Sequence, residues 1–366
     1  MPAGSGTAPF PAGLSEQSQV ADAPAPTRDD GGGRSMRPRP DRKGRAMSAA
    51  GSTTDGSSST DTARNETSGD ETASHGIVVG YDGSPGARLA LEWAIETAKR
   101  DERPLTLLHC VGLTMTPTFR AYDPGVQARP YDVMAQGVLT EAVEIATKTL
   151  RPEDVHSLSV IGSAAAELVG VSDRADVVVT GSRGHGAISA GLLGSTSYAV
   201  TAHAHCPAVV VRGDAVVHAG PSHPVVAAFD DSKNAQQALE TAVQVAAAAQ
   251  APLHVIAVDN VGGLEVWPEN DTMIGREEMM ESMHRHVGQV LQDVTEDARQ
   301  AHPSLEIRTS VLGGSPGQAI AAYAVDVRAG LVVMGSRGHG GFTGMLLGSV
   351  SHRVVHDVPC PVMVIH

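Results

Sequence analysis

Cysteine, aromatic residues and long apolar runs are all scarce in this chain of 366 residues, and each shortage excludes a class of protein. Three cysteines without a C-x-x-C pair provide neither a disulfide framework nor a cysteine zinc site, which favours a reducing, cytoplasmic compartment. No run approaches the roughly 18 apolar residues of a membrane-spanning helix. The net charge of −14 argues against nonspecific binding to nucleic acid or to an anionic membrane.

Large apolar side chains are also nearly missing from residues 1–74, which are rich in Gly, Ser, Thr, Pro, Asp and Arg. Such a segment buries too little surface to offset its chain entropy, so we expect a disordered tail. No apolar h-region follows Met1, so the segment lacks the pattern of a secretory signal. Met36 and Met47 are alternative starts, and a start at Met47 would leave residues 1–46 out of the mature protein.

What the chain does have, after residue 74, is a repeated alternation of short apolar runs and longer helical patterns. Continuously apolar strands that alternate with helices predict a parallel sheet covered by helices on both faces. The expected strands of the first repeat are 77–81, 105–111, 155–161, 177–180 and 208–212, with helices at 85–100, 138–150, 164–172 and 195–203. The second repeat gives strands at 225–229, 253–258, 305–311, 331–334 and 362–365, with helices at 235–249, 279–299, 316–327 and 349–356.

The repeat period of about 150 residues indicates a duplicated domain rather than a solenoid. We therefore predict a domain at 75–213 (copy one), a linker at 214–223 with Gly-Pro turn chemistry and a second domain at 224–366 (copy two). Two irregular segments, 112–137 and 260–276, differ between the copies and are the expected source of functional differences between them.

A glycine-rich block occurs once in each copy, directly after an apolar strand. The two blocks are Thr180–Ser195 and Met334–Ser349, and both have the spacing G-x-x-G, nine residues, then Gly-Ser. Glycines permit close backbone approach, and the helix that starts at Gly-Ser offers free N–H groups to an anion. A single block of this kind could be a tight turn, but the identical spacing in both copies predicts two phosphate-binding loops.

An acidic residue follows the first strand of each copy, Asp82 in one and Asp230 in the other. Ligands of open parallel sheets bind at the carboxyl ends of the strands, where this acid would meet the glycine loop. Such a carboxylate would bind a nucleotide hydroxyl or base, or hold Mg²⁺; the alternative is an Asx-turn that only shapes the corner before the helix. Ser84 and Ser232 are the expected N-caps of that helix.

The second strands end in Cys110 and in Val258-Asp259. Small apolar side chains there could pack on an adenine, and Asp259 could accept hydrogen bonds from ribose hydroxyls. Ordinary packing at a strand end is the alternative, and for Cys110 the two interpretations are balanced.

Two well-known nucleotide signatures are missing. The sequence has no G-x-x-x-x-G-K-[ST], so it is not a P-loop ATPase, and no properly placed G-x-G-x-x-G, which makes dehydrogenase chemistry a poor hypothesis. His185 and His339 lie in the glycine loops without an evident nucleophile, and His284 and His286 have i, i+2 spacing that places them on different helix faces. We therefore predict no catalytic residue and no protein-held metal.

The two glycine blocks, the preceding acids and the Cys-Pro step before each last strand together resemble the universal stress protein family. The resemblance covers 75–212 and 224–366. It implies two tandem flavodoxin-like, Rossmann-like α/β sandwiches, each with a five-stranded parallel-type sheet, of the subfamily that binds ATP. It also implies that the last strands pair, so that the copies form a dimer within one chain, or that the chain forms a homodimer.

Carried over residue by residue, the resemblance places base and ribose beside the strand ends and phosphates on the glycine loops. In copy one the expected nucleotide-binding residues are Gly80, Asp82, Cys110, Gly181, Ser182, Arg183, Gly184, Gly194, Ser195, Thr196 and Ser197. In copy two they are Ala228, Asp230, Val258, Asp259, Gly335, Ser336, Arg337, Gly338, Gly348, Ser349, Val350 and Ser351. Copy two departs from the pattern where Gly83 becomes Asp231, which adds a negative charge, and where Gly80 becomes Ala228, which would narrow backbone access.

The sequence thus predicts a cytoplasmic stress-response protein that binds ATP or ADP with Mg²⁺, one site per copy, and whose partners depend on nucleotide occupancy. One alternative is an enzyme, either a slow ATPase or an adenylyl-transferring relative with a similar fold. The other is a scaffold that keeps the loops for their shape.

Overall fold

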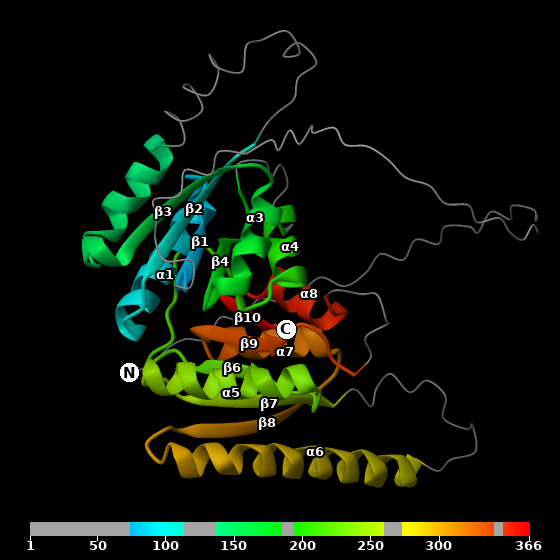
Figure 1. Ribbon diagram of the computed structural model, residues 1–366. Helices are drawn as coiled ribbons and strands as arrows, with labels where there is room; N and C mark the ends of the chain where they lie inside the picture. The colour runs from blue at the N-terminus through cyan, green and yellow to red at the C-terminus, as the bar shows by residue number, and fades with distance from the viewer. Residues whose placement is uncertain (1–73, 113–135, 185–192, 260–272, 340–346) are drawn as a thin grey trace, which may run out of the picture. The chain divides into compact units, whose positions relative to one another are not determined.

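The computed structural model describes residues 74–112, 136–184, 193–259, 273–339 and 347–366. The predicted disordered tail and most of the two irregular segments lie outside these residues. Strands and helices alternate through both copies, as expected from the apolar patterning (Figure 1).

Copy one contains, among its described residues, five strands, the helices α1, α3 and α4 and a further helical stretch at 136–146. The strands are β1 (Ile77–Gly80), β2 (Leu105–Val111), β3 (Val155–Ile161), β4 (Val177–Gly181) and β5 (Ala208–Val211). The helices are α1 (Pro85–Asp101), α3 (Ala164–Val171) and α4 (Ser195–His203), with short 3₁₀ turns η2 (Pro152–Asp154) and η3 (Ser172–Arg174).

Copy two repeats this order with β6 (Val225–Ala228), α5 (Lys233–Ala248), β7 (Leu253–Asp259), α6 (Met273–Ala301) and β8 (Ile307–Gly313). It continues with α7 (Pro316–Asp326), β9 (Leu331–Gly335), α8 (Ser349–Asp357) and β10 (Val362–Ile365). The boundaries agree with the sequence prediction to within two residues for nearly every element.

The strands form one ten-stranded sheet in the order β3-β2-β1-β4-β5-β10-β9-β6-β7-β8. All pairs within a copy are parallel, and the pair β5–β10 is antiparallel, with Val209 opposite Met363. The fold prediction is confirmed: each copy is a doubly wound α/β unit in which strands are added to one side of the first strand and then, from the fourth strand on, to its other side. That change of side opens the crevice in which such sheets bind ligands.

Helices cover both faces of the sheet, and the inner strands are mainly apolar and buried, whereas the edge strands β3 and β8 keep exposed polar residues such as Ser157 and Arg308. On one face Val79 and Leu107 pack with α1 and the helix 136–146, and the same core continues to α5 and α6 in copy two. On the other face α3 and α4 cover copy one, and α7 and α8 cover copy two. Ala202 of α4 belongs to the copy-two cluster.

The helix α6 is where the prediction was wrong, because it begins at Met273, six residues before the expected start and inside the segment predicted to be irregular. The missed residues 273–278 read Met-Ile-Gly-Arg-Glu-Glu, and the glycine in this stretch disfavours a helix by intrinsic propensity.

Candidate functional site

The first feature of the candidate site is the corner after β1. Asp82 accepts a hydrogen bond through Oδ1 from the Ser84 N–H at 3.0 Å, and the Ser84 hydroxyl accepts one from the Ala87 N–H at 3.2 Å. The first bond is an Asx-turn and the second is the N-cap that starts α1. One oxygen of Asp82 therefore forms the Asx-turn that was the alternative to a ligand-binding role.

The second oxygen of Asp82 faces the glycine loop. A Cβ added to Gly184 would stand 2.6 Å from Oδ2 of Asp82, so the carboxylate lies against the backbone of the loop. This contact follows from the strand register, in which Val79 pairs with Val179 and brings the two strand ends together. The acid and the loop are neighbours, although about 100 residues separate them in sequence.

Copy two repeats the arrangement with the same atoms. Asp230 Oδ1 accepts from the Ser232 N–H at 3.1 Å and from the Ser232 hydroxyl at 2.6 Å. Its Oδ2 lies against Gly338 as that of Asp82 lies against Gly184. The surroundings differ, because Asp230 is exposed whereas Asp82 is half-buried. Asp231 also adopts the left-handed φ of 62° where Gly83 has 80°.

Each glycine loop is closed at the start of the helix that follows. The Gly194 N–H donates to the Ser182 carbonyl at 2.9 Å, and the Ser197 hydroxyl donates to the Gly181 carbonyl at 2.6 Å. In copy two the corresponding bonds run from Gly348 to Ser336 at 2.7 Å and from Ser351 to Gly335 at 2.8 Å.

Four serines of the predicted phosphate set are buried by this closure. These residues are no more than 6% exposed: Ser182, Ser197, Ser336 and Ser351. The hydroxyls of Ser197 and Ser351 donate to loop carbonyls and hold each loop in its conformation. We assign them a positioning role. The residues left at the surface are Arg183, Gly184 and Ser195 in copy one, with Arg337, Gly338 and Ser349 in copy two.

The anchoring of the loop against the neighbouring helix differs between the copies. In copy one, Gly181 approaches the backbone of Gly86 so closely that a Cβ would collide with it. In copy two, Asn234 replaces Gly86 and donates from Nδ2 to the Ser336 hydroxyl at 3.0 Å. Copy two keeps a close approach, because a Cβ on Gly335 would stand 3.0 Å from the backbone carbon of Asn234, and it adds this side-chain hydrogen bond.

Gly80 and Ala228 lie at the ends of their strands but face the helix layer. A Cβ on Gly80 would stand 2.8 Å from Leu168 Cδ1, and the Ala228 methyl packs on the cluster beneath α7 and α8. The expectation that Ala228 narrows backbone access to a ligand was therefore wrong. A side chain at this position points into the protein.

The ends of the second strands are half-buried. Cys110 packs against the cluster that contains Leu168, and burial, with a smaller effect of Glu167, raises the pKa of its thiol to about 12. Val258 packs on the corresponding cluster of copy two. Asp259 is the last residue of β7, and its carbonyl accepts from the Gly314 N–H at 3.4 Å.

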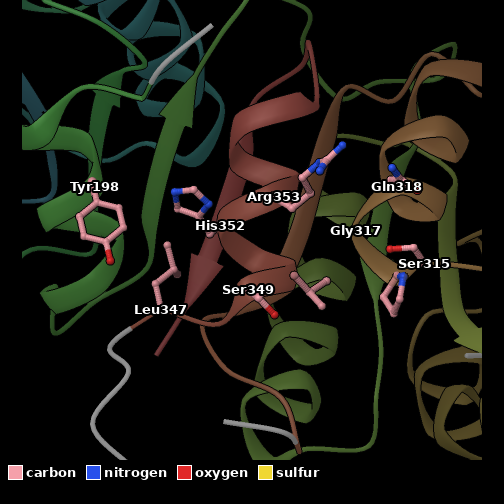
Figure 2. Close-up of a pocket in the computed structure, with 10 residues that line it drawn as sticks. Tyr198, Ser315, Gly317, Gln318, Leu347, Ser349, His352 and Arg353 are labelled. Atoms are coloured by element: carbon pink, nitrogen blue, oxygen red, sulfur yellow. The ribbon is translucent and has the colours of Figure 1, made fainter. Parts of the chain in front are cut away.

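An open depression of about 790 Å³ lies next to the copy-two loop (Figure 2). It is lined by the predicted residues Ser349 and Val350 and by eight residues for which no site role was predicted: Tyr198, Ser315, Pro316, Gly317, Gln318, Leu347, His352 and Arg353. Figure 2 shows that Tyr198, from α4 of copy one, lies beside His352, while Arg353 and Gln318 lie across α8 from them. Ser315 follows the end of β8, so the carboxyl-end rule applied to this strand would have found it.

The part of the chain that the structure describes holds no group of three or more His, Cys, Asp or Glu side chains positioned for a metal. Among those same residues, no helix combines the length and the apolar content needed to cross a bilayer.

Comparisons of the sequence and of the structure with known proteins lead to the same family. The sequence profile of the universal stress protein family matches residues 74–212 and again 221–366. The universal stress protein Rv2623 of Mycobacterium tuberculosis is 32% identical over 299 residues, which cover 80% of this chain and 96% of that protein. Rv2005c of the same organism is 31% identical over 296 residues, 79% of this chain and 96% of its own length.

A solved universal stress protein from Archaeoglobus fulgidus aligns with a TM-score of 0.56 at 25% identity, over 80% of this chain and 98% of its own. The tandem α/β fold, the paired glycine loops and the double match of the family profile lead to one conclusion: this chain belongs to the universal stress protein family, with two family domains in tandem.

Proposed function

We propose that this protein binds an adenine nucleotide, ATP or ADP, at one site in each copy and acts as a nucleotide-dependent regulatory protein in a stress response. The observation that carries the proposal is the contact between a carboxylate and a glycine loop at the start of a helix. It occurs twice, as Asp82 with Gly184 and as Asp230 with Gly338.

The phosphates are assigned to the helix end of each loop. The first turns of α4 and α8 carry no side-chain cap, so their N–H groups remain donors for an anion. Gly194 and Gly348 use their own N–H groups to close the loops, which leaves the donors of the next residues, Ser195 and Ser349. Arg183 and Arg337 are exposed nearby and add positive charge.

The acid fixes the orientation of the nucleotide. A carboxylate repels a phosphate, so Asp82 and Asp230 support binding of the sugar or base end, where hydroxyl or amino groups can donate to Oδ2. The phosphates then extend away from the acid toward α4 or α8. Mg²⁺ would reduce the repulsion, and it fits the chemistry of carboxylate and phosphate oxygens at these positions.

A binding protein is favoured over an enzyme because, among the residues that the structure describes, no activated nucleophile takes matching positions in the two copies. The thiols of Cys110, Cys206 and Cys360 have pKa values raised to about 12 by burial, so they are poor nucleophiles. His339 is exposed in its loop, and its equivalent His185 lies outside the described residues. A slow ATPase or an adenylyl-transferring enzyme remains the second hypothesis.

Isothermal titration of the full chain with ATP and with ADP, in the presence of Mg²⁺, tests the proposal. We expect two equivalents for the wild type, one for Gly184→Glu or Gly338→Glu and none for the double variant, because the new side chain occupies the place beside the Asp carboxylate. Gly170→Glu is the matched control, since Gly170 is exposed on α3 with no heavy atom within 4 Å of an added Cβ.

Binding of ATP by the double variant with wild-type stoichiometry would contradict the assigned site, and no binding by the wild type would reject both the binder and the enzyme. A single-turnover assay with labelled ATP separates these two. Intact nucleotide after incubation supports a binding protein, whereas released phosphate or a transferred adenylyl group supports the alternative.

A further inference from the structure

The helix α8 carries two histidines, His352 and His356, on one face. Residues four apart on a helix are neighbours, and the two imidazole rings are nearly parallel, with centroids 6.5 Å apart and planes inclined by 22°. His352 is exposed, and the side chain of His356 is 31% exposed. A pair of histidines at i and i+4 on a helix is the spacing with which two imidazoles bind one metal ion.

Asp357 adds an interaction that orients one of the rings. Its Oδ1 lies 2.7 Å from Nδ1 of His356, and its Oδ2 is paired with the guanidinium of Arg353. A carboxylate in this position holds the proton on Nδ1, which leaves the lone pair of Nε2 as a ligand.

We propose that His352 and His356 form a surface site for a divalent transition metal that prefers imidazole, such as Cu²⁺, Ni²⁺ or Zn²⁺, with water in the remaining coordination positions. Of these ions, two imidazoles bind Cu²⁺ most strongly. The site is specific to copy two, because Tyr198 and Ala202 occupy the equivalent positions of α4 when the helices are aligned at Ser195 and Ser349.

Each histidine also has a simpler explanation that does not involve a metal. His352 makes an edge-to-face contact with Tyr198, with ring centroids 5.9 Å apart. His356 lies in the last turn of α8, where a cation interacts favourably with the helix dipole. These explanations require an aromatic ring at 352 and a positive charge at 356, but they do not require two imidazoles.

Two variants separate the explanations, since His352→Phe keeps the ring against Tyr198 and His356→Lys keeps the charge in the last turn. The assay is isothermal titration of the full chain with nickel chloride and copper chloride at pH 7.5 in a buffer that does not bind metals. Because the chain has 16 histidines, the site is identified by the equivalent that is lost relative to the wild type. His284→Asn, at an exposed position of α6, is the matched control.

We expect each variant to lose one equivalent that the wild type and the control retain, and the Cu²⁺ resonance spectrum of that equivalent to show imidazole nitrogen couplings. Asp357→Ala should weaken this equivalent about tenfold while retaining the nitrogen couplings. Retention of the full stoichiometry and affinity by His352→Phe or by His356→Lys, or the absence of metal binding by the wild type, would overturn the proposal.

Discussion

Gly181→Ala is the substitution whose effect on stability the structure defines best. Gly181 ends β4, and an added Cβ would collide with the carbonyl group of Gly86 and stand 2.9 Å from the Ala87 nitrogen. These are backbone atoms of the first turn of α1, which the Ser84 cap fixes, and β4 lies between β1 and β5. Neither partner can move aside at low cost.

The expected loss of unfolding free energy is the difference between two opposing effects. Overpacking of a closely packed contact costs about 2 kcal/mol. Alanine also restricts the unfolded chain more than glycine does, which stabilises the folded state by about 0.5 kcal/mol. The net loss is therefore about 1.5 kcal/mol, or roughly 3–6 °C in Tm for a domain of this size.

Gly184→Ala, three residues away, should behave differently. Its Cβ would meet Oδ2 of Asp82 at 2.6 Å, which is the end of a side chain that can rotate. We expect a change in unfolding free energy below about 1 kcal/mol, but a displaced carboxylate and weaker ATP binding by copy one. The glycines of one loop thus separate into one required for packing and one required for the site.

Urea unfolding followed by circular dichroism, together with ATP titration, measures both effects. Gly170→Ala is the control, because the same substitution in open space on α3 should raise stability slightly. Equal midpoints for Gly181→Ala and Gly170→Ala, or an equal loss for Gly181→Ala and Gly184→Ala, would refute the reasoning.

Four further predictions concern the caps, the buried groups and the unequal corners. Ser84→Ala removes the N-cap of α1 and should cost about 1 kcal/mol in urea unfolding, whereas Ser84→Gly should cost less. Burial, with a smaller effect of Arg308, lowers the pKa of His254 below 6.5, so the unfolded chain takes up the proton first. Stability should be constant above about pH 7.5 and fall as the pH drops below 6.5, and His254→Thr should reduce that slope; an unchanged slope argues against this assignment. Asp231→Gly should raise the unfolding free energy by about 1 kcal/mol by relieving a left-handed φ of 62°, and an unchanged midpoint would show that the strain is absent. A thiol reagent at pH 8 should react slowly with the folded protein and rapidly after denaturation, because burial raises the pKa of all three thiols to about 12; fast reaction in the folded state would contradict this.

Much of the fold could be predicted because its signals are local. A parallel strand buried on both faces is mainly apolar, so β2 and β10 were found at the residues where they occur. The caps Ser84 and Ser232 marked the starts of α1 and α5 for the same reason, since a cap depends on the next three residues. The start of α6 was missed because its first turn contains Gly275, a residue of low helical propensity.

The candidate site was predictable in its parts but not in their roles. The spacing of the glycine loop is a local property, whereas the burial of Ser197 depends on how α4 docks on β4. The direction of the side chain at Ala228 depends on the helix that covers that face of the sheet. Tyr198 was missed because it belongs to copy one but lines a depression formed mainly by copy two, and the sequence of copy one carries no signal of that contact.

The sequence by itself determined the strand and helix order, the duplication and the two glycine loops, because each depends on residue spacing and hydrophobic pattern over a few dozen residues. The tertiary structure decided which atoms meet: Asp82 with Gly184, β5 with β10, and His352 with His356 beside Asp357. Contacts of this kind depend on packing between distant segments and on side-chain rotamers, and neither is encoded in local spacing. The two copies therefore share a pattern in sequence and differ in their sites.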